Sequence, residues 1–141
     1  MKAILYADGG SRGNPGPSAG AAVLYDARKE ELGRIGRHIG TATNNVAEYT
    51  GLLLGITMAA AKGVTQLEVR MDSELIIKQM RGEYRVKHPS LQPLHARVAR
   101  VAATFTHIAW HHVPRAQNAA ADALVNLYLD RGIIGAHEKM V

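Results

Sequence analysis

Cysteine is absent from the 141 residues of the sequence. Its absence excludes disulfide bonds, thiolate nucleophiles and zinc sites built on thiolates. A chain without cysteine also suits a reducing compartment.

Long hydrophobic runs are missing as well. The apolar N-terminal stretch reaches an acid at Asp8, so it is too short for the core of a secretory signal. The most apolar region, residues 52–61, is interrupted by Gly55 and Thr57 and falls short of the roughly 20 residues that span a bilayer. We therefore expect a cytoplasmic protein that makes no contact with membranes.

The residues that are present indicate one compact domain over residues 1–141. Hydrophobic residues make up 47% of the sequence and charged residues 21%, which supports a packed core and argues against disorder. No internal repeat, low-complexity stretch or linker divides the chain. Lysine and arginine outnumber aspartate and glutamate by 17 to 12, and this basic balance permits a polyanionic partner.

Periodicity predicts an α/β protein with one mixed sheet. Three consecutive strands with short links indicate an antiparallel meander, and a strand after each of two helical regions adds parallel pairings. We therefore expect a five-stranded sheet with helices on both faces. The predicted strands cover residues 2–7, 18–25, 31–39, 66–71 and 105–113. The predicted helices cover residues 45–62, 73–80, 91–103 and 118–129, whereas residues 133–141 show no clear period.

Two aspartates lie at predicted strand ends. Asp8 ends the first strand beside a glycine-rich segment, and Asp72 ends the fourth strand. Open α/β sheets bind their ligands at such strand ends. An isolated aspartate in this position is more often a turn residue, so neither placement alone identifies a site.

Two further acids lie on the apolar faces of predicted helices. Glu48 heads the apolar stripe of its helix, with Leu52 four residues on, and Asp122 has a similar place in the last helix. A carboxylate on a face that packs against a sheet requires a partner. Helix capping is the simpler interpretation, because Asn45 with Glu48 resembles a capping box and Asn118 resembles a cap. Capping explains an acid near each helix start, but not why both acids face inward.

Four converging carboxylates would repel one another and lose hydration, and a cation would relieve both effects. Sites with only oxygen ligands suit Mg²⁺ or Mn²⁺. Two such ions, roughly 3.5–4 Å apart, stabilise both oxygens of an in-line phosphoryl displacement. We therefore expect two ions, held by the four acids Asp8, Glu48, Asp72 and Asp122.

Four motifs in the sequence resemble type 1 ribonuclease H and occur in that family's order. They are Tyr-Ala-Asp-Gly-Gly-Ser-Arg-Gly-Asn-Pro-Gly-Pro at residues 6–17, Thr-Asn-Asn-Val-Ala-Glu at 43–48, Asp-Ser at 72–73 and Asn-Ala-Ala-Ala-Asp at 118–122. The resemblance implies the ribonuclease H-like fold. It also implies an endoribonuclease that cleaves the RNA strand of RNA–DNA hybrids without sequence specificity and leaves 5′-phosphate and 3′-hydroxyl ends.

The resemblance further implies a role for each acid. Asp8 would bridge the two ions, and Asp122 would complete the ion that carries the attacking water. Glu48 and Asp72 would complete the ion on the leaving-group side. Glu48 would also bind a ribose 2′-hydroxyl, which only the RNA strand carries. A monomer would bind the hybrid through its backbone and minor groove.

Substrate contacts are expected from two loop segments and one helix start. Backbone N–H groups at Gly9 and Gly10 can approach a sugar–phosphate chain closely. Thr43, near a helix N-terminus, resembles the family's DNA-phosphate pocket. Plain helix capping explains Asn44 or Asn45 equally well when either is taken alone. The complete expected set is Gly9, Gly10, Ser11, Asn14, Thr43, Asn44, Asn45 and Glu74.

The sequence departs from many family members before its last helix. Residues 113–117 form a short link that lacks the mobile histidine of longer members and resembles a subgroup with a Val-Pro-Arg loop. Arg115 is the catalytic candidate in its place. His111 and His112 are interpreted as structural residues of the fifth strand.

A second departure follows the second predicted helix. The connection at residues 81–89 is short and lacks the lysine- and tryptophan-rich protrusion with which many members grip DNA. Glu74 stands where better-known members often carry a neutral amide. The affinity for the hybrid is therefore expected to be lower than in those members.

Two other functions stay open at this point. One is a non-catalytic nucleic-acid-binding or scaffold domain on the same fold, and the other is a different nuclease of the same superfamily. The presence of all four acids argues against the first, and Asn14 together with residues 43–45 argues against the second. Cleavage tests on matched RNA–DNA, RNA–RNA and DNA–DNA duplexes separate the possibilities.

Overall fold

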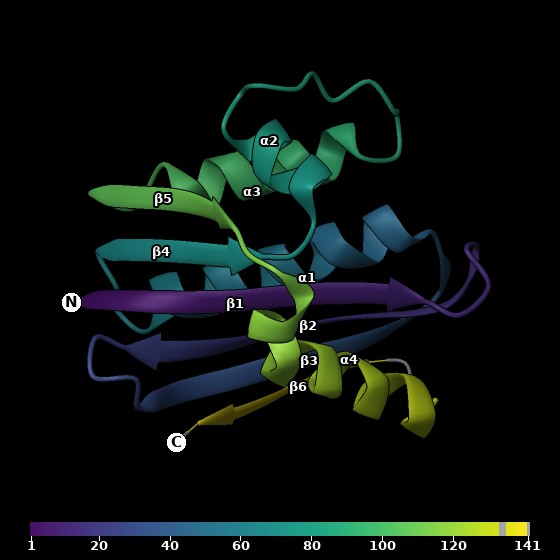
Figure 1. The fold of residues 1–141 in the computed structure, drawn as a ribbon, viewed down its shortest axis with the longest axis horizontal. Coiled ribbons are helices and arrows are strands. Elements are labelled where there is room, and N and C mark those ends of the chain that lie inside the picture. The colour runs from purple at the N-terminus through teal and green to yellow at the C-terminus, as the bar shows by residue number, and fades with distance from the viewer. Residues whose placement is uncertain (133–134, 141) are drawn as a thin grey trace.

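The computed structural model describes residues 1–132 and 135–140 and contains one mixed six-stranded sheet (Figure 1). The strands are β1 (Lys2–Ser11), β2 (Gly16–Asp26), β3 (Glu31–Ala42), β4 (Gln66–Met71), β5 (His107–His112) and β6 (Gly135–Met140). The helices are α1 (Asn44–Ala61), α2 (Glu74–Met80), α3 (Gln92–Ala102), the 3-10 helix η1 (Arg115–Asn118) and α4 (Ala119–Arg131). Among the described residues, no helix is long and apolar enough to cross a membrane.

The predicted fold class is confirmed. The meander β1–β2–β3 is antiparallel, β4 joins β1 in parallel, and β5 joins β4 in parallel. Periodicity misses one strand, β6, which pairs antiparallel with β3 at the edge of the sheet. Its sequence, Gly-Ala-His-Glu-Lys-Met, has no apolar alternation, so only its backbone pairing identifies it.

Helices cover both faces of the sheet, as predicted, and each face has its own apolar core (Figure 1). On one face α1 packs against β1 and β2, with α3 packed against α1. Leu5 and Leu52 are fully buried in this larger core. On the other face α4 packs against β2, where Val125 and Tyr128 belong to a smaller core. The two helices that carry predicted functional acids therefore approach the sheet from opposite sides.

Glycines bring α1 into backbone contact with β1. A Cβ atom at Gly9 would lie 2.2 Å from the carbonyl carbon of Ala47, and one at Gly51 would lie 2.1 Å from the carbonyl oxygen of Asp8. Neither distance leaves room for a carbon atom in a close-packed interior. The close approach sets Glu48, between Ala47 and Gly51, directly over the strand that carries Asp8.

We expect Gly51→Ala to destabilise the protein by about 3 kcal/mol, because the added methyl group must displace backbone atoms of β1. Helix propensity alone favours alanine by about 1 kcal/mol at this position, so the two effects differ in sign. Chemical denaturation of both proteins measures the difference. Gly10→Ala is the matched control, since its Cβ would meet only Val125 Cγ1, at 3.6 Å. A Gly51→Ala variant as stable as the parent would contradict the close contact.

The first strand is longer than predicted, which corrects the placement of three residues. Asp8, Gly9 and Gly10 lie within β1 rather than at its end and in a loop, because their pairing with β2 continues as far as Ser11. The parallel neighbour β4 pairs with β1 only over Lys2–Tyr6. Beyond that point, one edge of β1 has no strand beside it among the described residues. This stretch of β1, which is unpaired on one edge, is where the sheet can receive a ligand.

Candidate active site

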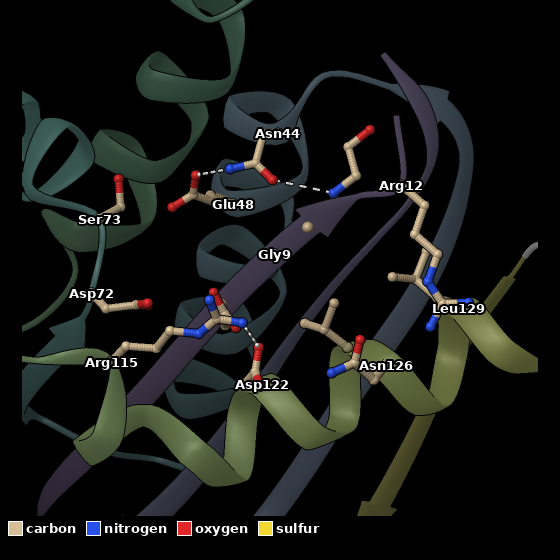
Figure 2. A pocket seen from close by; sticks show the side chains of 14 residues that line it. Gly9, Arg12, Asn44, Glu48, Asp72, Ser73, Arg115, Asp122, Asn126 and Leu129 are labelled. Atoms are coloured by element: carbon tan, nitrogen blue, oxygen red, sulfur yellow. Dashed lines mark hydrogen bonds and ion pairs between the residues drawn. The ribbon is translucent and has the colours of Figure 1, made fainter. Parts of the chain in front are cut away.

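A pocket of about 410 Å³ opens where β1 extends beyond the end of β4 (Figure 2). The four predicted acids line it, and each comes from a different part of the fold. They are Asp8 on β1, Glu48 on α1, Asp72 directly after β4 and Asp122 on α4. The topology of the chain thus gathers acids that are far apart in the sequence into one small volume.

Asp8 is the most strongly perturbed of these acids. It is buried, with 7% of its surface exposed. Burial and then repulsion by Asp72 raise its pKa to about 8, with smaller contributions of the same sign from Asp122 and Glu48. A hydrogen bond from the backbone N–H of Gly9 acts in the opposite direction. A carboxylate in this environment favours a bound cation, which would remove the repulsion.

Glu48 is oriented by a neighbouring amide on α1. Its Oε1 accepts a hydrogen bond of 2.9 Å from Nδ2 of Asn44, whose Oδ1 accepts one of 3.2 Å from the backbone N–H of Ser11 (Figure 2). Burial raises the pKa of Glu48 to about 7, although a hydrogen bond with Ser73 lowers it. Asn44 therefore links the open part of β1 to a buried functional carboxylate.

The capping interpretation is wrong for Glu48. The N-cap of α1 is Thr43, not Asn45, and the Thr43 hydroxyl accepts a hydrogen bond of 3.3 Å from the backbone N–H of Val46. No acid lies in the first turn of the helix, so Glu48 is too far along to close a capping box. Capping therefore does not explain why Glu48 faces inward.

We expect the metal-free protein to lose on the order of 2–4 kcal/mol of stability as the pH rises from about 5 to about 8. The folded-state pKa values of Asp8 and Glu48, about 8 and about 7, exceed their ordinary values of 3.8 and 4.5. Over this range the unfolded chain has already released protons that the folded chain retains, so stability falls as the pH rises. Below the ordinary values both states are protonated and the dependence vanishes.

Thermal melting in the presence of a chelator tests this expectation. Asp8→Asn should flatten the pH dependence and should melt above the parent at pH 8, because it removes the buried charge. A parent melting temperature that rises between pH 5 and pH 8 would show that these carboxylates are not buried together.

Asp72 has an unexpected partner. Asn118 is predicted as the cap of the last helix, but its side chain makes no capping hydrogen bond. Its backbone, with φ −109° and ψ 23°, lies outside the extended region that a capping side chain needs. The side-chain nitrogen donates hydrogen bonds of 2.9 Å to Oδ1 of Asp72 and 2.9 Å to the carbonyl oxygen of Ala7 instead.

Asp122 faces Arg115 at the mouth of the pocket. Nη2 of Arg115 lies 3.5 Å from Oδ1 of Asp122 (Figure 2). The Arg115 side chain is 78% exposed and the Asp122 side chain 33% exposed, so the pair contributes little to stability. The guanidinium is therefore free to exchange this carboxylate for an anionic ligand.

The acidic donors of the pocket fit a hard divalent cation. In the part of the chain that the structure describes, no three acidic or imidazole side chains are arranged to enclose a metal ion by themselves. Mg²⁺ needs only one or two carboxylates for each ion, because water and substrate phosphates complete its shell. Four carboxylates around one pocket, with a raised pKa at Asp8, provide such partial shells.

Comparison with known proteins identifies the family. Residues 6–128 match the family model described as reverse transcriptase-like. The chain is 44% identical to the N-terminal RNase H domain of Rv2228c from Mycobacterium tuberculosis, with a TM-score of 0.91 over 94% of this chain and 96% of that chain. It is 40% identical to RNase H1 from Halobacterium salinarum, with a TM-score of 0.90 over 93% and 99% of the two chains. The chain belongs to the ribonuclease H family.

Other members of the ribonuclease H family extend the comparison. LC11-RNase H1, whose structure contains an RNA/DNA hybrid, is 40% identical, with a TM-score of 0.87 over 92% of this chain and 97% of that chain. Among curated relatives, the bifunctional protein Rv2228c of Mycobacterium tuberculosis is 46% identical over 131 residues. The chain spans only about a third (36%) of that relative's length.

The other predicted contacts of this ribonuclease H family member lie mainly in two pockets. Gly9, Gly10, Ser11 and Asn44 line the pocket that holds the four acids. A second pocket of about 400 Å³ is lined by Asn14, Thr43, Asn44 and Asn45, together with His88, Ser90 and Leu91. Sequence analysis misses His88 and Ser90, since no local motif marks them and only the packing of the chain before α3 brings them there. Glu74 lines neither pocket and forms an ion pair of 2.9 Å with Lys78 on α2.

Several residues of the acidic pocket were not predicted. Arg12 lines it and forms an ion pair of 2.7 Å with Asp130. Asn126 and Leu129 also line it, and their spacing from Asp122 places all three on one face of α4. That spacing is the feature of the sequence from which these two could have been predicted.

The structure also describes the residues at the two places where the sequence departs from many family members. In the connection at residues 81–89, the Arg81 side chain is engaged, because its Nε donates a hydrogen bond of 2.9 Å to the carbonyl oxygen of Trp110. His111 and His112 lie in β5, as predicted, but their side chains are exposed and therefore pack in neither core.

Proposed function

We propose that the protein is an endoribonuclease that cleaves the RNA strand of RNA–DNA hybrids and leaves 5′-phosphate and 3′-hydroxyl ends. The observation that carries this proposal is the convergence of four carboxylates, from four parts of the fold, on one pocket. The similar LC11-RNase H1 has been seen with an RNA/DNA hybrid. We expect the protein to act as a monomer in the cytoplasm.

The four acids would hold two Mg²⁺ or Mn²⁺ ions, which supply Lewis acidity at the phosphate and acidify a bound water. Asp8 would contact both ions. Asp122 would belong to the ion on the side of the attacking water, and Glu48 and Asp72 to the ion on the leaving-group side. The burial of Asp8 and Glu48 keeps bulk water away from these carboxylates and strengthens their attraction for cations.

Glu48 would distinguish RNA from DNA by accepting a hydrogen bond from a ribose 2′-hydroxyl. Asn44 holds Oε1 of this carboxylate in place, which would orient the group toward a ligand. Because minor-groove contacts read hydroxyls and shape, cleavage without base specificity is expected. The backbone and polar side chains that would bind the two strands are Gly9, Gly10, Ser11, Asn14, Thr43, Asn44 and Asn45, with Glu74 at the periphery.

Cleavage of end-labelled RNA in matched duplexes tests the proposal. The RNA strand is annealed to DNA or to RNA, and a DNA–DNA duplex of the same sequence serves as the control, each with Mg²⁺, with Mn²⁺ or with chelator. We expect metal-dependent cuts within the RNA strand of the hybrid and an intact DNA–DNA duplex. Ligation of the fragments without prior phosphorylation would verify the 5′-phosphate. A protein that binds the hybrid but never cuts it is a binding domain, and this outcome would overturn the proposal.

A further inference from the structure

Asn118 is more deeply buried than either of the buried acids of the pocket. It is 1% exposed, compared with 7% for Asp8 and 8% for Glu48. It ends η1, the segment that follows β5 and crosses β4 and β1 on its way to α4 (Figure 1). Both hydrogens of its side-chain nitrogen are used, one by Oδ1 of Asp72 and one by the carbonyl oxygen of Ala7, each at 2.9 Å.

The orientation of this amide is fixed by its partners. If the amide were flipped, its oxygen would face a carbonyl oxygen and a carboxylate oxygen, and both hydrogen bonds would become repulsive contacts. In the observed orientation, Oδ1 of Asn118 is buried without a hydrogen-bond partner within the described residues. Buried acceptors are seldom left unpaired. The Asn118 amide thus leaves its oxygen unpaired, while its nitrogen donates hydrogen bonds to both Ala7 and Asp72.

These two hydrogen bonds connect the parts of the chain that carry two of the acids. Ala7 immediately precedes Asp8, so the first bond fixes the peptide that carries Asp8. The second bond fixes one oxygen of the Asp72 carboxylate and leaves its other oxygen, Oδ2, to point elsewhere. A carboxylate held at one oxygen loses less rotational freedom when it binds a cation.

We propose that Asn118 is a positioning residue, which holds the Asp72 carboxylate at a fixed place relative to Asp8 so that both can bind the same pair of cations. The inference rests on the proposed two-ion function. It assigns Asn118 a donor role that neither alanine nor aspartate can perform, whereas serine could supply a single hydrogen.

Manganese binding to the whole protein, measured by calorimetry without substrate, tests this proposal. We expect Asn118→Ala to weaken Mn²⁺ binding about 10–100-fold, the effect typical of residues that orient metal ligands. The Mn²⁺ affinity of Asn118→Ser should lie between those of Asn118→Ala and the parent. Gln117→Ala is the matched control and should bind Mn²⁺ as the parent does, because Gln117 is an exposed amide in the same 3-10 helix that lines neither the acidic pocket nor the second pocket.

A double-mutant cycle shows whether Asn118 acts through Asp72. If it does, Asp72→Asn combined with Asn118→Ala should bind Mn²⁺ no more weakly than Asp72→Asn alone. Losses that add in the double variant would overturn the inference, as would a folded Asn118→Ala or Asn118→Ser variant with the parent's affinity. Melting in chelator establishes which variants are folded, and the serine variant serves if the alanine variant is not.

In the same variants, the turnover number for a hybrid should fall while the Michaelis constant changes little, because Asn118 lies beneath the acids and lines neither substrate pocket. A parent protein that binds no Mn²⁺ at all would refute the two-ion function itself. A parent that binds Mn²⁺ with the same affinity as Asn118→Ala would refute only the role of Asn118.

Discussion

Asp8→Asn is expected to abolish cleavage of an RNA–DNA hybrid, with a loss of at least about 10³-fold in rate. Asp8 is the acid proposed to contact both ions, and its carboxylate interacts with all three of the others. Asparagine keeps the shape of the side chain and one oxygen but loses the charge that attracts the cations. Metal ions supply several kcal/mol of transition-state stabilisation, and each 1.4 kcal/mol or so corresponds to tenfold in rate.

Single-turnover cleavage with excess enzyme measures this loss, and fluorescence anisotropy with labelled hybrid measures binding. Binding should be mostly retained, because phosphate contacts elsewhere supply most of the affinity. Asp26→Asn is the control: Asp26 accepts hydrogen bonds from the backbone N–H groups of Arg28 and Glu30 in a distant turn, and asparagine retains that oxygen. Cleavage by Asp8→Asn within about tenfold of the parent would refute the two-ion assignment.

Arg115→Ala is expected to lower the turnover number about 10²–10³-fold, the usual cost of removing a donor that stabilises charge in the transition state. Its guanidinium lies at the mouth of the acidic pocket, 3.5 Å from Asp122, on a side chain that is 78% exposed. An exposed pair of this kind contributes little to stability, so a loss of activity cannot be ascribed to unfolding. Arg115→Lys should recover only part of the loss, because an ammonium group cannot reproduce the planar fork.

Steady-state kinetics with a hybrid substrate separates catalysis from binding in this variant. Arg12→Ala is the matched control, because it removes the same charge from the same pocket and also breaks a surface ion pair. That control should raise the Michaelis constant and lower the salt dependence of binding by about one unit, with little change in turnover. If Arg115→Ala behaves like Arg12→Ala, Arg115 is a phosphate contact and the four acids suffice for catalysis.

Five strands of the sheet, the helices and the inward positions of Glu48 and Asp122 could be predicted from the sequence because each depends on a local pattern. Apolar alternation marks the central strands, and helical spacing shows that Glu48 and Asp122 face inward. An acid on the apolar face of a helix indicates a functional site, since such an acid does not stabilise the fold. The resemblance then supplied the chemistry that the pattern alone could not.

The features that were mispredicted depend on contacts between distant parts of the chain. Asp8 lies inside β1 because β2 continues to pair beyond the last pairing with β4. Thr43 rather than Asn45 is the N-cap of α1, and both residue types are favoured at that position. Asn118 has the residue type of a cap, and only the folded chain shows that its amide reaches Ala7 and Asp72.

Helices must dock on both faces of the sheet before the four acids can come together. Glu48 is carried by the helix on one face and Asp122 by the helix on the other, so the pocket is complete only after both helices have docked. During synthesis the N-terminal part of a chain emerges and begins to fold first, and the α4 segment emerges after the segments that carry the other three acids. A nascent chain therefore carries Asp8, Glu48 and Asp72 for some time without the fourth acid. We therefore expect a chain whose α4 has not yet docked to lack a complete set of acids and to cleave RNA poorly.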